Sequence, residues 1–266
     1  MAPSPGELTL RGRHSGGDPD APGRQCGTGV GAGAPAMTAL TPPTSTPATP
    51  PGADPELRTR AAAVRLYLVT DAGADAAATL GVVRAACEGG AEAVQLRRKG
   101  DHGLDDLRLA DRCRAVTAAA GILFVVNDRL DIAMAVGADG VHLGQDDLPV
   151  AVARRLWPGG LIGRSTHSLA QARAAVIEGA DWIGVGPVFA TPTKPGRAAV
   201  GLDLVAAVAG EVDIPWVAIG GIELGTIDRV TAAGARAVAV VRAVTGVGDA
   251  AAACRALRAR LVAAAA

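Results

Sequence analysis

The sequence has few aromatic residues and no net charge, and both features limit what it can bind. Phe, Trp and Tyr make up 2% of the 266 residues, too few for the stacking surfaces that bind single-stranded nucleic acid. The 26 Lys and Arg residues balance 26 Asp and Glu residues. A general electrostatic attraction to nucleic acid or to an anionic membrane is therefore not expected. An anionic ligand would need a local site.

Cysteine pairs and long apolar runs are also missing. The four cysteines have no CxxC spacing and no neighbouring His, so neither a disulfide framework nor a zinc site is expected. No apolar run approaches the roughly 20 residues of a membrane-spanning helix, and the N-terminus lacks the pattern of a secretory signal. We expect a soluble cytoplasmic protein that binds small molecules. Its oligomeric state, including a homo-oligomer, stays open.

The first 57 residues differ in composition from the rest of the chain. Eleven of the 17 prolines precede Arg58, and the segment TPPTSTPATPPGADP (41–55) shows almost no apolar periodicity. Such a segment buries too little apolar surface to offset the entropy of ordering. We expect residues 1–57 to form a disordered leader and residues 58–266 to form one folded domain. Met37 is an alternative start.

Short apolar runs alternate with longer stretches of helical period throughout the expected domain. The near-continuous apolar character of the runs predicts strands buried on both faces, as in a parallel sheet covered by helices. Eight such units in about 200 residues predict an α/β fold of the (β/α)8 TIM-barrel type. An open doubly wound sheet is the alternative, but no GxGxxG follows the first run. The expected strands are RLYLV (65–69), AEAVQL (91–96), ILFVV (122–126), DGVHL (139–143), LIG (161–163), DWIGVG (181–186), PWVAIG (215–220) and RAVAVV (236–241).

Polar residues and glycines follow every expected strand. In a barrel of this type these positions form the active face, whereas the opposite strand ends are mostly Gly-Ala turns. The catalytic and ligand-binding residues are therefore expected at one end of the barrel. The candidate positions are Thr70 and Asp71, Arg97 to Lys99, Asn127 and Asp128, Gly144 to Asp147, Ser165 to His167, Gly186, Gly220 and Gly221, and Val241 and Arg242.

The segment QLRRKG (95–100) carries three long hydrogen-bond donors. The period of two places Gln95, Arg97 and Lys99 on one face of an extended segment. Donors that converge in this way suit a polyanion, because Arg offers a planar fork and Lys a mobile point charge. An ordinary solvated strand end is the alternative.

Carboxylates follow the third and fourth strands, which are neighbours in a barrel. Asp128 comes after Asn127, and Asp146 and Asp147 follow the next strand. Carboxylate oxygens without nearby His or Cys favour a hard ion, Mg²⁺ rather than Zn²⁺. Helix N-capping is the alternative role for each aspartate.

The later strand ends suit phosphate. The long loop 184–201 carries Thr191, Thr193 and Lys194 and could close over a ligand. Gly220-Gly221 and Val241-Arg242 follow strands seven and eight, where barrels of this class commonly bind phosphate.

The histidines do not indicate nucleophilic catalysis. His142 lies within an expected strand and is expected to be structural, and His167 has no adjacent carboxylate. No Gly-x-Ser-x-Gly occurs. The residues instead predict metal-assisted chemistry on a diphosphate, with a second phosphorylated ligand nearby.

Taken in order, these motifs resemble the thiamine-phosphate synthase (thiamine phosphate pyrophosphorylase) family. The resemblance runs from about residue 65 to 245. It implies a transferase that joins 4-amino-2-methyl-5-hydroxymethylpyrimidine diphosphate to hydroxyethylthiazole phosphate, or its carboxylated form. The products would be thiamine phosphate and pyrophosphate, with Mg²⁺ required. The motifs are LYLVTD, QLRRK, VNDR, GADGVHLGQDDLPV, STH, GVGPVFATPTK, AIGGI and AVAVV.

The resemblance also assigns roles residue by residue. Asp128 and Asp147 match the family's magnesium ligands. Arg164 and Arg242 depart from the family pattern, which often has an apolar residue and Ser at these positions. The matches to the pyrimidine-diphosphate contacts are Gln95, Arg97, Lys99, Asn127, Ser165 and Lys194, of which Arg97, Lys99, Ser165 and Lys194 are the expected catalytic residues. The matches to the thiazole-phosphate contacts are Thr191, Thr193, Gly221, Val241 and Arg242.

Two other functions are weighed against this one. A related thiazole tautomerase performs a proton shift without a diphosphate substrate, but the presence together of QLRRK, Asn127-Asp128 and Asp147 argues against it. A non-catalytic sensor of phosphorylated ligands would not need the metal carboxylates, and both are present.

Overall fold

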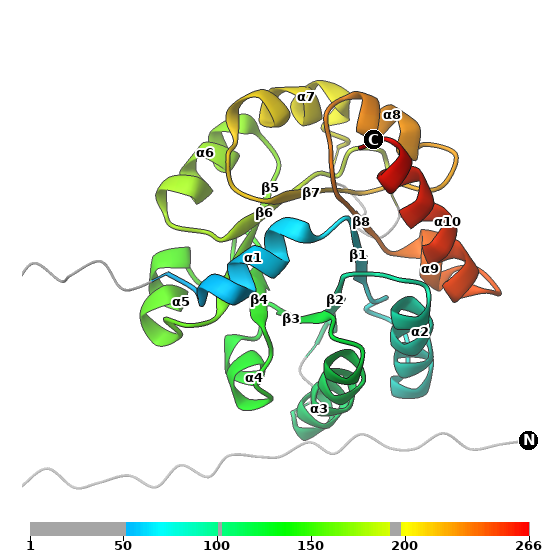
Figure 1. Ribbon diagram of the computed structural model, residues 1–266. Coiled ribbons are helices and arrows are strands. Elements are labelled where there is room, and N and C mark those ends of the chain that lie inside the picture. The colour runs from blue at the N-terminus through cyan, green and yellow to red at the C-terminus, as the bar shows by residue number, and fades with distance from the viewer. Residues whose placement is uncertain (1–51, 101–102, 192–197, 266) are drawn as a thin grey trace, which may run out of the picture. The chain divides into compact units, whose positions relative to one another are not determined.

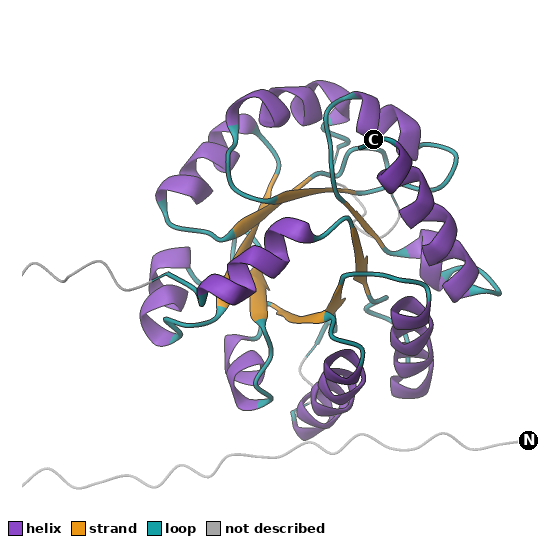
Figure 2. Cartoon of the chain, in the orientation of Figure 1, coloured by secondary structure: helices purple, strands orange, loops and turns teal. Residues whose placement is uncertain are grey.

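The computed structural model describes residues 52–100, 103–191 and 198–265. Within them, eight parallel strands close into a barrel in the order of the sequence, and helices surround the strands (Figure 1, Figure 2). The predicted (β/α)8 TIM barrel is confirmed. The strands are β1 (Leu66–Val69), β2 (Ala93–Leu96), β3 (Leu123–Asn127), β4 (Gly140–Leu143), β5 (Leu161–Thr166), β6 (Trp182–Val185), β7 (Trp216–Ile219) and β8 (Val238–Val240).

Helices follow each strand, and several begin at a side-chain cap. Asp75 Oδ1 accepts a hydrogen bond from the backbone N–H of Ala78 at 2.8 Å, and Asp249 Oδ1 accepts one from Ala252 at 2.8 Å. The two capped helices pack against one another outside the barrel, whose wall is closed by the pairing of β1 with β8. The helices are α1 (Pro55–Ala63), α2 (Ala76–Glu88), α3 (Leu104–Ala119), α4 (Leu130–Ala135), α5 (Val150–Leu156), α6 (Leu169–Ile177), α7 (Gly201–Glu211), α8 (Ile227–Ala232), α9 (Arg242–Thr245) and α10 (Ala250–Ala263).

The apolar residues of each strand divide between two packed layers. Along β1, Leu66 and Leu68 pack between the sheet and the helices, whereas Tyr67 and Val69 belong to the barrel interior. This alternation follows from the period of two in a strand. Because both layers are buried, all four residues of the strand are apolar or aromatic. None of the helices in the described ranges is long and apolar enough to cross a membrane.

Helix α1 lies across the amino-terminal end of the barrel (Figure 1). It begins at Pro55, Asp54 caps it by accepting from the N–H of Glu56 at 2.8 Å, and Ala53 is buried. The domain boundary expected between residues 57 and 58 therefore falls inside a helix and has to be moved upstream. The expectation counted Pro55 with the aperiodic segment, but proline at the first helical position is favourable because its fixed φ suits a helix start. The rest of the expected leader, residues 1–51, lies outside the described residues.

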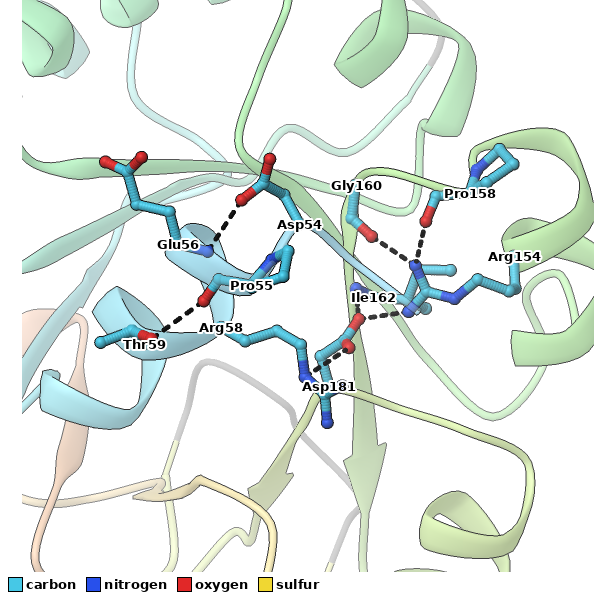
Figure 3. A network of polar contacts seen from close by, with 10 residues as sticks. All are labelled: Asp54, Pro55, Glu56, Arg58, Thr59, Arg154, Pro158, Gly160, Ile162 and Asp181. Carbon is cyan, nitrogen blue, oxygen red and sulfur yellow. Dashed lines mark hydrogen bonds and ion pairs between the residues drawn. The ribbon is translucent and has the colours of Figure 1, made fainter. Parts of the chain in front are cut away.

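Buried charges hold the amino-terminal end together. Asp181 accepts a hydrogen bond from the N–H of Ile162 at 2.8 Å and pairs with Arg154 (Figure 3). Arg154 also donates to the carbonyl oxygen of Gly160 at 2.6 Å, and Arg58 of α1 lies 3.8 Å from Asp181. Because the Arg154 and Asp181 side chains are 7% and 4% exposed, the pair is protected from solvent screening. At this end of the barrel, Arg58, Arg154 and Asp181 therefore have a structural role.

Candidate active site

A cavity of about 780 Å³ opens at the carboxyl ends of the strands. This volume lies within the usual range for small-molecule sites. We call it the carboxyl-end cavity. Its walls include eight of the residues that the sequence singled out: Gln95, Arg97, Asn127, Ser165, Thr191, Gly221, Val241 and Arg242.

Gln95 and Tyr67 form part of the cavity floor. Gln95 ends the pairing of β2 with β1, is 4% exposed, and donates from Nε2 to the Tyr67 hydroxyl at 3.1 Å. Tyr67 projects into the barrel interior, where burial raises the pKa of its phenol above the ordinary value. The phenol therefore stays neutral and serves as a fixed partner for the Gln95 amide.

The segment after β2 sends alternate side chains in opposite directions. The Thr70 hydroxyl accepts from the backbone N–H of Arg97 at 2.9 Å, which fixes the backbone while the Arg97 side chain lines the cavity. Arg98 turns away and pairs with Asp106 at the start of α3, with Nε and Oδ1 3.0 Å apart. Lys99 Nζ donates to Asp128 Oδ2 at 3.0 Å. The expected donor face is thus divided between the cavity and the adjacent carboxylate.

Asp128 and Asp147 come together as the sequence predicted. Burial raises the pKa of Asp128, a hydrogen bond with the Asp147 carboxyl raises it further, and Lys99 lowers it in part. Asp147 is oriented by the backbone N–H of Gly144, which donates to its Oδ2 at 2.6 Å. Asp128 has a φ of 62°, a left-handed conformation that is costly for a residue with a side chain. Two adjacent carboxylates with one Lys beside them form a site suited to a cation.

Asn127 and Ser165 contribute polar atoms to the same cavity. The Nδ2 of Asn127 is buried and has no hydrogen-bond partner among the described residues, a costly arrangement unless a ligand accepts the bond. Ser165 lies in β5, which ends at Thr166, three residues beyond the strand end that the sequence predicted at 163, and Ser165 Oγ is 3.0 Å from His142 Nε2. A donor that lacks a partner beside an oriented hydroxyl indicates a polar ligand.

Arg164, one of the two departures from the family pattern, does not enter the cavity. Its guanidinium donates to the carbonyl oxygens of Leu148 at 3.1 Å and Gln145 at 3.3 Å. Gln145 in turn donates from Nε2 to the Ser165 carbonyl oxygen at 2.6 Å. Arg164 therefore braces the loop that carries Asp147, and an apolar residue at this position could not make these bonds.

Glycines bring the β7 end close to the loop that follows β6. Gly220 and Gly221 have φ of 102° and 66°, and a Cβ on Gly221 would lie 2.7 Å from Phe189 Cβ. Only glycine combines this backbone with this approach. Val241 and Arg242 line the cavity beside them at the start of α9. Thr191 also lines the cavity, whereas Thr193 and Lys194 lie outside the described residues.

Two residues that support the site from the barrel interior, Tyr67 and Trp182, were not among the candidate positions. They contact Gln95 and His142, whereas Thr70 was a candidate and His142 was expected to be structural. The inward positions of Tyr67, His142 and Trp182 on β1, β4 and β6 follow from the period of two, which could have indicated them. Their hydrogen-bond partners, however, depend on which strands are neighbours.

Comparison with known proteins agrees with this geometry. The family model described as thiamine monophosphate synthase matches residues 66–244. A thiamine-phosphate synthase of Gloeobacter violaceus is 51% identical over 195 residues, which cover 73% of this chain and 56% of the relative. One from Chloroflexus aurantiacus is 50% identical over 197 residues, which cover 73% of this chain and 91% of that relative. The chain thus spans just over half the length of the first relative and nearly all of the second.

Among solved structures, a thiamine phosphate pyrophosphorylase from Pyrococcus furiosus has the same fold. Its TM-score is 0.71 at 36% sequence identity, and the match covers 79% of this chain and 100% of that chain. The family-model match, residues 66–244, spans all eight strands of the barrel. The chain belongs to the thiamine monophosphate synthase family.

Proposed function

We propose that the chain is a transferase that joins 4-amino-2-methyl-5-hydroxymethylpyrimidine diphosphate to hydroxyethylthiazole phosphate, or its carboxylated form. The products are thiamine phosphate and pyrophosphate. The observation that carries this proposal is the pair Asp128 and Asp147, held together beside Lys99. Asp128 follows Asn127, which lines the cavity with Arg97 and whose Nδ2 has no partner among the described residues. The family membership supplies the substrates.

The two carboxylates fit a magnesium ion. Mg²⁺ is usually held by one or two carboxylates together with phosphate oxygens of the substrate, and the raised pKa of Asp128 reflects a site that gains from a positive charge. Asp128 and Asp147 would be its protein ligands. When bound, the ion would supply positive charge to the departing diphosphate.

The side chains around the carboxylates suit a dissociative transfer. Breaking the C–O bond leaves a methylene cation stabilised by the pyrimidine ring, while negative charge gathers on the diphosphate oxygens. Arg97, Lys99 and Lys194 would stabilise that charge more in the transition state than in the ground state. The Nδ2 of Asn127 and the hydroxyl of Ser165 would orient the same substrate by hydrogen bonds.

The second substrate would be positioned by its phosphate. Thr191, Thr193, Gly221, Val241 and Arg242 would hold the phosphate of the thiazole so that the ring nitrogen faces the methylene carbon. Such anchoring converts the encounter into an oriented reaction within one complex. The nitrogen attacks with its own lone pair, so no protein base is required, in agreement with the absence of a base motif in the sequence.

One incubation tests the proposal. The full-length protein is mixed with the pyrimidine diphosphate, the thiazole phosphate and Mg²⁺, and thiamine phosphate and pyrophosphate are measured together by chromatography. Equimolar formation of both products is expected, with a strong decrease in the Asp128→Asn variant. Binding of both substrates without products would indicate a sensor instead. Rearrangement of the thiazole without release of pyrophosphate would indicate a tautomerase.

A further inference from the structure

Three side chains form a hydrogen-bonded series through the barrel interior. The indole Nε1–H of Trp182 donates to His142 Nδ1 at 3.0 Å, and His142 Nε2 lies 3.0 Å from Ser165 Oγ. Trp182 and His142 are both buried, and their ring planes are inclined by only 16°. We call these residues the Trp182–His142–Ser165 series. It reaches the carboxyl-end cavity at His142 and Ser165.

The other end of the series lies in a different cavity. Trp182 lines a space of about 980 Å³ at the amino-terminal end of the barrel, which we call the amino-end cavity. The edge of Tyr67 packs on the Trp182 ring with centroids 6.1 Å apart and an interplanar angle of 82°. Trp182 and Tyr67 therefore separate the two cavities, and the Trp182 indole is held in place from the side.

Glycines in the neighbouring strands make room for the Trp182–His142 contact. A Cβ on Gly163 of β5 would clash with Trp182 Nε1 and lie 2.5 Å from His142 Nδ1. A Cβ on Gly184 of β6 would lie 3.3 Å from His142 Cε1. Glycine weakens a strand interior and often marks a close approach of another group. Here both glycines face the same imidazole, so the barrel interior is shaped around it.

The Trp182 contact decides which nitrogen of His142 carries the proton. An indole N–H can only donate, so Nδ1 must accept and cannot carry a hydrogen. In the neutral imidazole the proton then lies on Nε2, which donates to Ser165 Oγ. A serine hydroxyl that accepts this bond still has its own hydrogen, and that hydrogen must point elsewhere.

We infer that Trp182, acting through His142, fixes the Ser165 hydroxyl as a donor directed into the carboxyl-end cavity, toward an acceptor atom of the pyrimidine diphosphate. This inference rests on the proposed function for the identity of the acceptor. Without the indole N–H, His142 could adopt the other tautomer and accept the Ser165 hydrogen at Nε2. Ser165 would then present only lone pairs to the cavity. Trp182 and His142 are thus positioning residues for Ser165.

The first test measures the tautomer directly in the ligand-free, full-length protein. Nitrogen-15 NMR of the histidine side chains distinguishes a protonated from an unprotonated ring nitrogen, and the His142 signals are assigned by their loss in His142→Gln. We expect Nδ1 unprotonated and Nε2 protonated. In Trp182→Phe, which keeps the aromatic packing and removes the donor, we expect a protonated Nδ1 to appear. A protonated Nδ1 in the wild-type protein, or no change in Trp182→Phe, would overturn the inference.

The second test asks whether the effect reaches the reaction through Ser165. Trp182→Phe should lower kcat about fivefold, while the KM for the thiazole phosphate changes less than twofold. The same substitution in a Ser165→Ala background should lower kcat no further, because the group it positions is gone. An equal decrease in both backgrounds would mean that Trp182 acts on the fold and would overturn the inference.

A matched pair at His142 repeats this test without altering Trp182. The side-chain amide of Gln can place a donor near the position of Nε2, so His142→Gln should keep kcat within about threefold of the wild type. His142→Leu fills similar space without a donor and should lose as much as Ser165→Ala. Equal losses in the two variants would contradict the inference. The tautomer of His142 is measured without substrates, so the NMR result tests the hydrogen-bonded series by itself. Failure of the protein to make thiamine phosphate would refute the proposed function, and the NMR result would still decide the inference about Trp182 and His142.

Discussion

Replacing Asp128 with Asn should stabilise the metal-free protein while it removes activity. Burial and the Asp147 carboxyl raise the pKa of Asp128, and Lys99 offsets them only in part. The folded protein therefore holds Asp128 in a place that favours the neutral acid over the carboxylate. Asn has no charge, and it is one of the few residues that readily adopt the left-handed backbone, with a φ of 62°, found at this position.

The size of the effect follows from what Asn removes and what it loses. The lost contact is the Lys99 pair, in which the Lys side chain is 59% exposed, and pairs of this kind contribute about 0.2–1 kcal/mol. Relief of an unfavourable charge commonly yields about 0.5–2 kcal/mol. We expect a net gain on the order of 1 kcal/mol at pH 7, which corresponds to about 2–4 °C in Tm for a domain of this size.

The gain should depend on pH, because the raised pKa belongs to the folded state. Below about pH 3.9, the ordinary value for Asp, Asp128 is protonated in both states and contributes its full stability. That contribution is lost as the pH rises through the raised folded-state pKa. The free energy of unfolding of Asp128→Asn minus that of the wild type should therefore be smallest near pH 4. It should increase with pH and then level off.

Urea unfolding in excess chelator between pH 4 and 8 measures this difference. Asp131→Asn is the control of opposite sign, because Arg129 donates to both Asp131 oxygens at 2.9 and 2.6 Å and lowers the pKa of Asp131. The stability that Asp131 contributes is present above about pH 3.9 and is lost as the pH falls through its lowered pKa. Both side chains are exposed, so this variant should lose at most about 1 kcal/mol at pH 7. A wild-type protein that is more stable than Asp128→Asn at pH 7 would refute the reasoning.

Asp128→Asn should also reduce turnover at least ~100-fold with both substrates and Mg²⁺ present. This is the scale of a lost charge contact in the transition state. Asp147→Asn should have a comparable effect. Near-normal turnover in both variants, or full activity of the wild type in excess chelator, would show that these carboxylates do not hold the metal.

Three further outcomes are expected. Arg242→Ala should raise the KM for the thiazole phosphate about tenfold, equivalent to ~1.4 kcal/mol, and that for the pyrimidine diphosphate much less; equal shifts in steady-state kinetics would point to general disruption. A chain that begins at Gly52 should keep the Tm and kcat of the full chain. A chain that begins at Arg58 lacks the first turn of α1, so its Tm should be several degrees lower. Equal Tm values for the two chains would show that this turn is dispensable. Arg154→Leu leaves buried Asp181 without its close partner and should lower the free energy of unfolding in urea by about 3–5 kcal/mol. The control Arg58→Leu, at an exposed residue, should lower it by less than about 1 kcal/mol. Similar losses in the two variants would contradict the role of burial.

The sequence could predict the barrel and the end that carries the site, because both depend on local patterns. Eight apolar runs of strand length locate all eight strands to within a few residues. Asp128 and Asp147 could be brought together because consecutive strands are neighbours in a barrel. The place of Ser165 was less predictable, since β5 runs on to Thr166 where the apolar pattern already ends at Gly163. A polar strand end resembles a loop when only one strand is considered.

Contacts that cross the barrel could not be predicted in this way. Lys99 was expected to face the ligand with Arg97, and its pairing with Asp128, which follows the next strand, could not be read from the segment 95–100 alone. His142 was expected to be structural, and its partners Trp182 and Ser165 come from β6 and β5. Only the closed order of strands shows that these three side chains meet.

The repeated turns EGGAEAV, VGADGV, EGADWI and AAGARAV show how one pattern can have a second meaning. Each joins the end of a helix to the next strand through glycine, and the acidic residue that directly precedes the strand in three of them has a further role. Each of these three carboxylates accepts a hydrogen bond from a backbone N–H near the start of the strand that comes before it in the chain. Glu92 accepts from Leu66 of β1 at 2.8 Å, Asp139 from Phe124 of β3 at 2.7 Å, and Asp181 from Ile162 of β5 at 2.8 Å. The fourth turn has Arg236 in that position, which cannot accept such a bond, and Arg236 lines the amino-end cavity. The carboxylates thus close the amino-terminal end of the barrel where they occur, and the cavity opens beside the one turn that lacks a carboxylate.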